Sequence, residues 1–295
     1  MTTTIDETSA KRSTAELADV QNSPDRRDIR IDKVGVKNIE YPIVVKDRAK
    51  GTQSTVGTID MYVDLPAHFK GTHMSRFLEV LNAHEGSIGV EEIPDILEAM
   101  RSRLDAETAH FKVTFPYFIE KLAPVTGARG MMPYRCGFDA CSGTHNDFVV
   151  RVEVPVTTLC PCSKEISSRG AHNQRGIVRL SVRFEGELWI EELIEWIEAS
   201  ASCDLYPVLK RQDEKYVTEK AFDNPRFVED LSREVTLRLR RDPRIRWFAV
   251  EVENFESIHA HNAYAYIEQR NGSERAADGD RGGREQPSGG KEGCR

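Results

Sequence analysis

Long apolar segments are missing from this sequence of 295 residues. No apolar run approaches the roughly 20 residues that a helix needs to span a bilayer. The first residues, Met1 to Asp19, are polar and contain no apolar core of a secretory signal peptide. We therefore expect a cytoplasmic protein with no membrane partner.

An excess of basic residues is missing as well, because 41 Lys and Arg residues stand against 48 Asp and Glu residues. The formal net charge is −7, whereas proteins that bind nucleic acids usually carry a basic balance. We therefore expect no nucleic-acid partner, although a local basic pocket for a small anion is compatible with this charge. The hydrophobic fraction of 39% and the charged fraction of 30% are typical of a globular protein with one or two domains.

Cysteine is scarce, with six residues in the chain. So few cysteines in a cytosolic protein of this length do not predict a disulfide framework. Cys203 follows a helical pattern and is expected to be buried as a small apolar residue. Cys294 lies in the C-terminal tail and has no expected role. The remaining cysteines are Cys136, Cys141, Cys160 and Cys162.

Composition and hydrophobic pattern divide the chain into four parts. Residues 1–18 and 271–295 are rich in small, polar and charged residues, and we expect both tails to be disordered. Two structural modules are expected between them, at 19–145 and 146–270. Alternating apolar residues predict strands around 29–46, 55–65, 111–115, 131–138, 150–156, 178–184, 248–252 and 262–268. Apolar residues at helical spacing predict helices around 74–81, 93–104, 190–197 and 225–241, the last of them opened by Pro225.

The predicted elements follow the order ββααββ twice. Strands that are neighbours in sequence, with helices inserted as a pair, indicate antiparallel sheets with helices on one face, which is an α+β fold. Such a sheet has exposed edges and one open face. Because closure into a barrel with other subunits would remove both, we expect a homo-oligomer.

The segment with the strongest chemical signal begins directly after the predicted strand 150–156. Cys160 and Cys162 flank one proline, and His172 follows ten residues later. Zinc and similar ions take Cys and His ligands together, and nearby Lys164 would favour a thiolate. The segment therefore predicts a metal or nucleophile site. The alternative is a structural zinc cluster completed by Cys136 and Cys141.

Two further polar segments lie in the second half of the chain. Residues 209–219 link two predicted helices and mix cations with carboxylates. This segment is either a solvated loop or a source of a metal-ligating carboxylate beside cations for an anionic substrate. Residues 253–262 lie between the last two strands. Glu256 and His259 in this segment are candidates for acid–base groups or for a carboxylate that binds a purine edge, and an ordinary turn is the alternative.

The segment 70–77 begins a predicted helix in the first half. Thr72 or Ser75 is a candidate cap of this helix. His73 and Arg76, together with the helix N-terminus, are candidates for binding phosphate. A plain helix start accounts for the same residues equally well.

Taken together, these motifs resemble those of the prokaryotic type IB GTP cyclohydrolase I family of the tunnelling-fold superfamily. The resemblance extends over about 19–268, and the motifs occur in the family's order. The matching motifs are Asp19-Val20-Gln21, Gly71 to Phe77, Leu159 to Ser167, Gly170 to Arg175, Leu209 to Lys215, Phe227 to Asp230 and Glu256 to His259.

The resemblance implies two tunnelling-fold (T-fold) modules per chain, assembled as a homotetramer. The implied reaction converts GTP and water to 7,8-dihydroneopterin triphosphate and formate, the first step of tetrahydrofolate and, in many bacteria, queuosine-type biosynthesis. A related alternative is a tunnelling-fold nitrile reductase with a Cys nucleophile and NADPH. An alternative of another class is a non-catalytic binding module with structural zinc.

The resemblance also implies roles for individual residues. A divalent metal (zinc, manganese or ferrous iron) is expected on Cys160 or Cys162, His172 and Glu214, with the second cysteine and His259 in proton transfer. The residues expected to bind substrate are Glu229 and Glu256 for guanine, and Lys70, His73, Arg76, Lys210 and Arg211 for the triphosphate.

Overall fold

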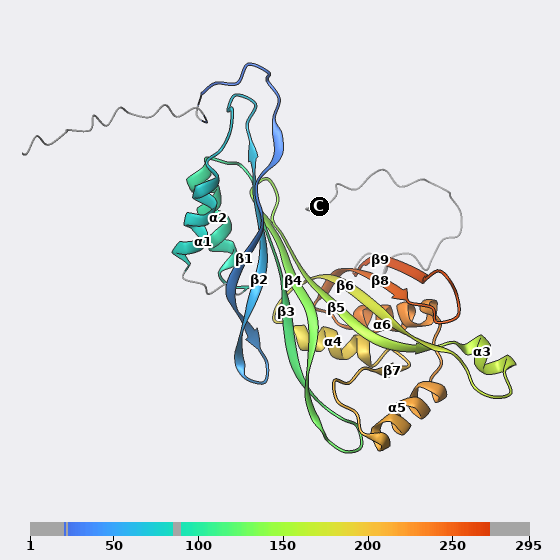
Figure 1. The fold of residues 1–295 in the computed structure, drawn as a ribbon. Helices are drawn as coiled ribbons and strands as arrows, with labels where there is room; N and C mark the ends of the chain where they lie inside the picture. Colours follow the sequence, from blue (N-terminus) through green and yellow to red (C-terminus); the bar gives the residue numbers. More distant parts are fainter. Residues whose placement is uncertain (1–20, 22, 85–89, 272–295) are drawn as a thin grey trace, which may run out of the picture.

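In the computed structural model, most of the helices lie against one face of a single sheet (Figure 1). The structure describes residues 21, 23–84 and 90–271, so the two tails expected to be disordered lie outside it, apart from residue 271. The strands are β1 Ile31–Asp47, β2 Gly51–Leu65, β3 Ala109–Leu122, β4 Arg129–Ser142, β5 Asp147–Leu159, β6 Asn173–Phe184, β7 Cys203–Asp204, β8 Ile245–Asn254 and β9 Ala263–Arg270. The helices are α1 Met74–Ala83, α2 Ile93–Leu104, α3 Pro161–Ile166, α4 Ile190–Glu198, α5 Arg211–Asp223 and α6 Val228–Arg241.

All the strands belong to one sheet in the order β1-β2-β3-β4-β5-β6-β8-β9, with β7 paired to β5. Each pairing is antiparallel, which confirms the predicted α+β class. The expected boundary between residues 145 and 146 falls in the turn between β4 and β5. Because these two strands pair directly, the sheet is continuous there, and the division into two modules stays a prediction.

The core lies between the sheet and the helices. Alternation places Val150, Val152, Val154 and Val156 on the helix-covered face of β5, where each is at most 4% exposed. α1 and α2 cover the β1–β4 half of this face, and α4 and α6 cover the β5–β9 half (Figure 1). One continuous cluster of buried residues joins both halves, so the helices and the sheet share a single core.

Helix faces differ from expectation at two positions of α1. The apolar residues Met74, Phe77, Leu78 and Leu81 have the helical spacing that predicts one buried face. Phe77 and Leu81 are buried, but Met74 and Leu78 are 39% and 44% exposed. Among the described elements, α1 packs mainly on α2 and β1, and the buried side of α1 is a narrow stripe that contains Phe77, Val80 and Leu81. Cys203 is buried as expected, although it lies in a short strand.

Two predicted boundaries in the second half are wrong. Residues 209–219, expected as a link, mostly form helix α5. Helix α6 begins at Val228 and not at Pro225, because the backbone N–H of Phe227 is capped by the carboxylate of Asp230 at 3.0 Å. The segment after Cys160 also forms a short helix, α3, within the expected loop.

The face of the sheet opposite the helices is charged. Arg179 on β6 pairs with Glu251 and Glu253 on β8 at 2.6 and 3.2 Å. Arg183 pairs with Asp147 at 2.6 Å. Within the part of the chain that the structure describes, no helix combines the length and apolar character needed to cross a membrane.

Candidate active site

The first part of the candidate site joins the end of β5 to the start of β6. The backbone N–H of Cys160 donates to the carbonyl oxygen of His172 at 3.1 Å. Ser163 reinforces this link, because its hydroxyl donates to the Cys160 carbonyl at 3.1 Å and accepts from the His172 N–H at 3.2 Å. The structure therefore brings the predicted thiol and imidazole segments together.

The two cysteines lie in different surroundings. Cys160 is half-buried and caps helix α3, where its sulfur accepts a hydrogen bond from the Ser163 N–H at 3.4 Å. Cys162 is exposed in the first turn of the same helix. Lys164, expected to favour a thiolate, instead donates to the carbonyl oxygen of Phe222 at the end of α5. Of the two thiols, Cys160 has the more defined position beside His172.

The imidazole of His172 is held through one nitrogen. Its Nδ1 lies 3.1 Å from Oε1 of Gln174 and 3.4 Å from the hydroxyl of Ser257. With Nδ1–H donated to the amide oxygen, Nε2 carries the lone pair that a metal would take.

Gln174 connects this imidazole to a carboxylate. Its Nε2 donates to Oγ1 of Thr158 at 3.1 Å and to Oε1 of Glu256 at 3.4 Å. Gln174 is 8% exposed and Thr158 fully buried, so the amide is fixed on both sides. Gln174 lies within the motif Gly170 to Arg175, but the sequence did not indicate a role for it.

Two backbone contacts bring further segments to this end of the sheet. The N–H of Phe255, after β8, donates to the carbonyl of Arg175 at 2.9 Å. The N–H of Arg226, before α6, donates to the carbonyl of Leu159 at 3.0 Å. The first turn of α6, with the exposed Glu229, therefore begins a few residues from Cys160.

Glu214 does not join this cluster within one chain. It is exposed in the first turn of α5, whereas the opposite end of α5, at Phe222, contacts Lys164 of α3. Eight residues of helix separate Glu214 from Phe222, or about 12 Å. Among the described residues, no group of three or more His, Cys, Asp or Glu side chains is placed to hold a metal ion. The expected ligand set is thus divided between two places.

The expected triphosphate ligands are divided as well. Lys70, His73 and Arg76 follow β2, near the Ala109 end of β3, and Arg76 donates to the carbonyl of Arg103 at 3.2 Å. Helix α1 begins at Met74 with His73 as its N-cap, and neither Thr72 nor Ser75 caps it. Lys210 and Arg211 lie at the other end of β3, beside the β3–β4 turn. β3 extends over 14 residues, or about 45 Å, so one chain does not gather both groups.

His259 lies in the exposed turn between β8 and β9. Its ring stacks on that of His261 with the centroids 5.2 Å apart. Glu256 in the same turn is the member that reaches Gln174, so the structure connects one of the two predicted acid–base candidates to the His172 cluster.

The cysteines of the structural-zinc alternative lie away from Cys160. Cys136 is 2% exposed inside β4 and pairs in register with Val152 of β5. Cys160 comes eight residues after Val152, or about 26 Å along an extended strand. Cys141 is farther away still, opposite Asp147. Burial raises the pKa of the Cys136 thiol, which further disfavours a metal-binding thiolate.

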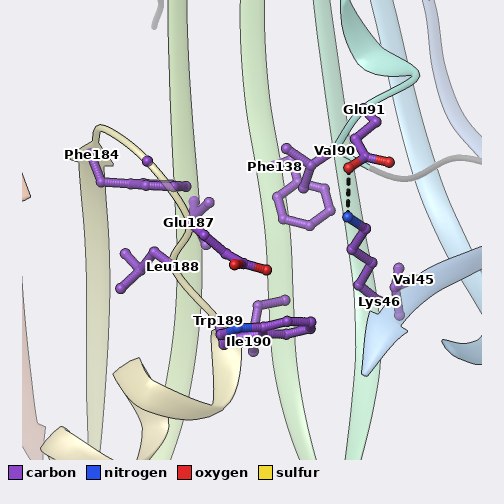
Figure 2. A pocket seen from close by; sticks show the side chains of 12 residues that line it. Val45, Lys46, Val90, Glu91, Phe138, Phe184, Glu187, Leu188, Trp189 and Ile190 are labelled. Atoms are coloured by element: carbon purple, nitrogen blue, oxygen red, sulfur yellow. Dashed lines mark hydrogen bonds and ion pairs between the residues drawn. The ribbon is translucent and has the colours of Figure 1, made fainter. Parts of the chain in front are cut away.

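A separate cavity of about 300 Å³ lies between the β1 and α2 region and the turn before α4 (Figure 2). Phe138, Phe184 and Trp189 point into it, and an ion pair between Lys46 and Glu91 lies at its side. This cavity contains none of the residues singled out in the sequence.

Comparison with known proteins assigns the chain to a family. The family model described as "Type I GTP cyclohydrolase folE2" matches residues 17–265. The chain belongs to the type I GTP cyclohydrolase FolE2 family. Among curated relatives, GTP cyclohydrolase FolE2 of Magnetococcus marinus is 58% identical over 253 residues, which cover 85% of this chain and 96% of the relative. That of Syntrophotalea carbinolica is 58% identical over 252 residues, with coverages of 85% and 95%.

Solved structures extend the comparison to the fold. A highly active mutant of Bacillus sp. TB-90 urate oxidase matches with a TM-score of 0.51 at 8% identity, covering 82% of this chain and 100% of the other. This likeness concerns the fold alone and confirms the predicted tunnelling fold. The family assignment confirms the GTP cyclohydrolase I part of the resemblance, and the FolE2 description does not state the subdivision IB.

Proposed function

We propose that this chain is a type IB GTP cyclohydrolase I that converts GTP and water to 7,8-dihydroneopterin triphosphate and formate. The observation that carries the proposal is the hydrogen-bonded series from His172 through Gln174 to Glu256. It joins a metal-type imidazole to a carboxylate suited to guanine, in a chain of the FolE2 family. The product would enter tetrahydrofolate or queuosine-type biosynthesis in the cytoplasm.

The donor types fit a divalent cation. A Cys160 thiolate, the His172 imidazole and the Glu214 carboxylate would suit zinc, with manganese and ferrous iron as alternatives. Such a cation supplies Lewis-acid activation of water for attack on C8 of guanine. The fixed Nδ1 of His172 supports this role, because it orients Nε2 as the remaining ligand atom.

The other residues would bind and protonate the substrate. The carboxylates of Glu256 and Glu229 can accept from N1–H and the exocyclic amine of guanine. The exposed imidazole of His259 can move protons during ring opening and closure. The triphosphate oxygens would be bound by the side chains of Lys70, His73, Arg76, Lys210 and Arg211.

The separation of Glu214 from Cys160 and His172 supports a site completed between subunits. Each chain would contribute Glu214 to the Cys160 and His172 cluster of another copy. Lys70, His73 and Arg76 would likewise reach a site on another copy. A homotetramer with closed barrels would also cover the charged open face and the edge strands β1 and β9.

The test uses the purified full chain loaded with zinc, manganese or ferrous iron and incubated with GTP. We expect release of formate together with a pterin that fluoresces after oxidation. Glu214→Gln should abolish both, whereas Glu219→Gln, on the same helix and also exposed, should not. Absence of both products with all three metals would overturn the proposal. NADPH oxidation with a nitrile substrate would instead support the reductase alternative.

A further inference from the structure

The N-terminal end of helix α5 is hydrogen-bonded to residues 123–128, which connect β3 and β4. Oδ1 of Asp213 accepts hydrogen bonds from the backbone N–H groups of Val125 and Thr126, each at 2.9 Å. Oδ2 accepts from the Thr126 hydroxyl at 2.6 Å and from the Lys210 N–H at 2.9 Å. The side chain is 0% exposed, so this carboxylate is satisfied entirely by protein donors.

The Asp213 carboxylate accepts more hydrogen bonds than the capping of helix α5 requires. An ordinary capping carboxylate accepts one bond from a backbone N–H of its own helix end, which Lys210 already supplies here. The remaining donors come from Val125 and Thr126, in the first half of the chain. Although burial alone would raise the pKa of the Asp213 carboxyl, these hydrogen bonds lower it, so the group stays charged at neutral pH.

Apolar packing does little to hold this helix. Asp213 and Ala221 are the buried residues of α5, and no α5 residue belongs to the central core cluster. A second polar contact joins Lys220 to Asp204 of β7 at 3.1 Å. The orientation of α5 therefore depends on polar contacts, of which those of Asp213 lie at the end that carries Glu214.

We propose that Asp213 is a positioning residue for Glu214, through which the β3–β4 turn sets where the metal-ligating carboxylate points. Successive helical residues differ in direction by about 100°, so a fixed inward Asp213 directs its neighbour Glu214 outward. The inference rests on the ligand role of Glu214 in the proposed function. Metal ligands need placement within about 0.5 Å. If the contacts between Asp213 and the β3–β4 turn were lost, Glu214 would no longer be held that closely.

The experiment measures the zinc Kd of the full chain by competition with a chromophoric chelator. We expect Asp213→Ala to weaken zinc binding about 10- to 100-fold. Asp213→Asn, whose amide oxygen still accepts from Val125 and Thr126, should weaken it less. Thr126→Val, which removes one donor and keeps the side-chain shape, should give a small loss. The matched control is Asp223→Asn at the exposed far end of the same helix, which should bind zinc as the unmodified chain does.

A double variant separates positioning from general destabilisation. If Asp213 acts through Glu214, then Asp213→Ala should add no further loss of zinc affinity to Glu214→Gln. Additive losses would overturn the inference. So would an unchanged Kd in Asp213→Ala and Thr126→Val when Glu214→Gln binds zinc weakly. An unchanged Kd in Glu214→Gln itself would overturn the ligand role assigned under the proposed function, and the inference with it. Cobalt substitution provides a second readout, because loss of a carboxylate ligand changes the visible absorption of the bound ion.

Discussion

Oε1 of Gln174 lies 3.1 Å from Nδ1 of His172, within hydrogen-bonding distance. The same amide donates to Thr158 and Glu256, so one buried side chain orients both a metal-type imidazole and a purine-type carboxylate. Outer-shell partners of this kind fix the tautomer and the ring orientation of a ligating histidine. The metal and guanine parts of the proposed site are therefore coupled through a single residue.

Replacement of Gln174 by Ala tests this coupling. We expect a loss of about 10- to 100-fold in metal affinity or activity, because the His172 ring loses its partner and Glu256 loses a donor. The measurement is the zinc Kd together with kcat and KM for GTP. Asn173→Ala, on the exposed side of the same strand, is the control. An unchanged zinc Kd and kcat/KM in Gln174→Ala would show that the amide only fills space.

Substitution of the two cysteines should have different effects on the amount of bound metal. Cys160 is half-buried with its sulfur bonded to the Ser163 N–H, whereas Cys162 is exposed. We therefore expect Cys160→Ser to lose most of its bound metal and Cys162→Ser to retain it. Metal content per chain after dialysis, measured by atomic emission, decides between them. Full occupancy in Cys160→Ser would assign the ligand to Cys162.

The period-two pattern made the strands the most predictable part of the fold. In β5, the buried residues Val150, Val152, Val154 and Val156 alternate with Arg151, Glu153 and Pro155, and such a pattern is typical of a strand with one face in the core. Strand pairing then accounts for the meeting of Cys160 and His172, since β5 and β6 are antiparallel neighbours and Leu159 lies opposite Asn173. Sequence order predicts that these two strands are antiparallel neighbours, but the meeting of Cys160 and His172 also depends on strand ends that extend beyond the predicted ranges 150–156 and 178–184.

Helix α5 was not predicted, because its residues lack an apolar stripe. Asp213 and Ala221 are its buried residues, so polar contacts to another part of the chain hold it, and these leave no periodic signal. Gln174 was missed for a related reason. A glutamine carries no metal or acid–base signal by itself, and its role depends on Thr158 and Glu256, which only the folded sheet brings to it.

The pH dependence of stability should depend on His110 of β3. Its Nδ1 is buried with no hydrogen-bond partner within the described chain. Burial, followed by the charges of Lys33 and His145 and opposed by Asp64, lowers the pKa of His110 to about 4. The unfolded chain takes up this proton near pH 6.5, so the unfolded state binds more protons between about pH 6.5 and 4. The free energy of unfolding should therefore decrease as pH falls through this range.

Urea denaturation at pH 7 and pH 5 measures this effect. His110→Gln removes the titrating group, so its stability should decrease less with acidification, by about 1 to 2 kcal/mol relative to the unmodified chain. The comparison between the two proteins cancels the titration of other groups. Equal losses of stability in both would exclude His110 as a source of the pH dependence.

Mixed assemblies test whether the site is completed between chains. Glu214 lies on α5 away from Cys160 and His172. In the proposed assembly, His172→Ala therefore removes a ligand supplied by one chain, and Glu214→Ala removes a ligand supplied by another chain. Each variant alone should be inactive. Co-assembly of the two by unfolding and refolding at equal concentrations should restore roughly a quarter of the activity, because a random share of the sites receives both intact residues. A mixture of each variant with itself is the control. If one chain supplies both residues to its own site, no mixture of the two variants regains activity, which would contradict the arrangement between subunits.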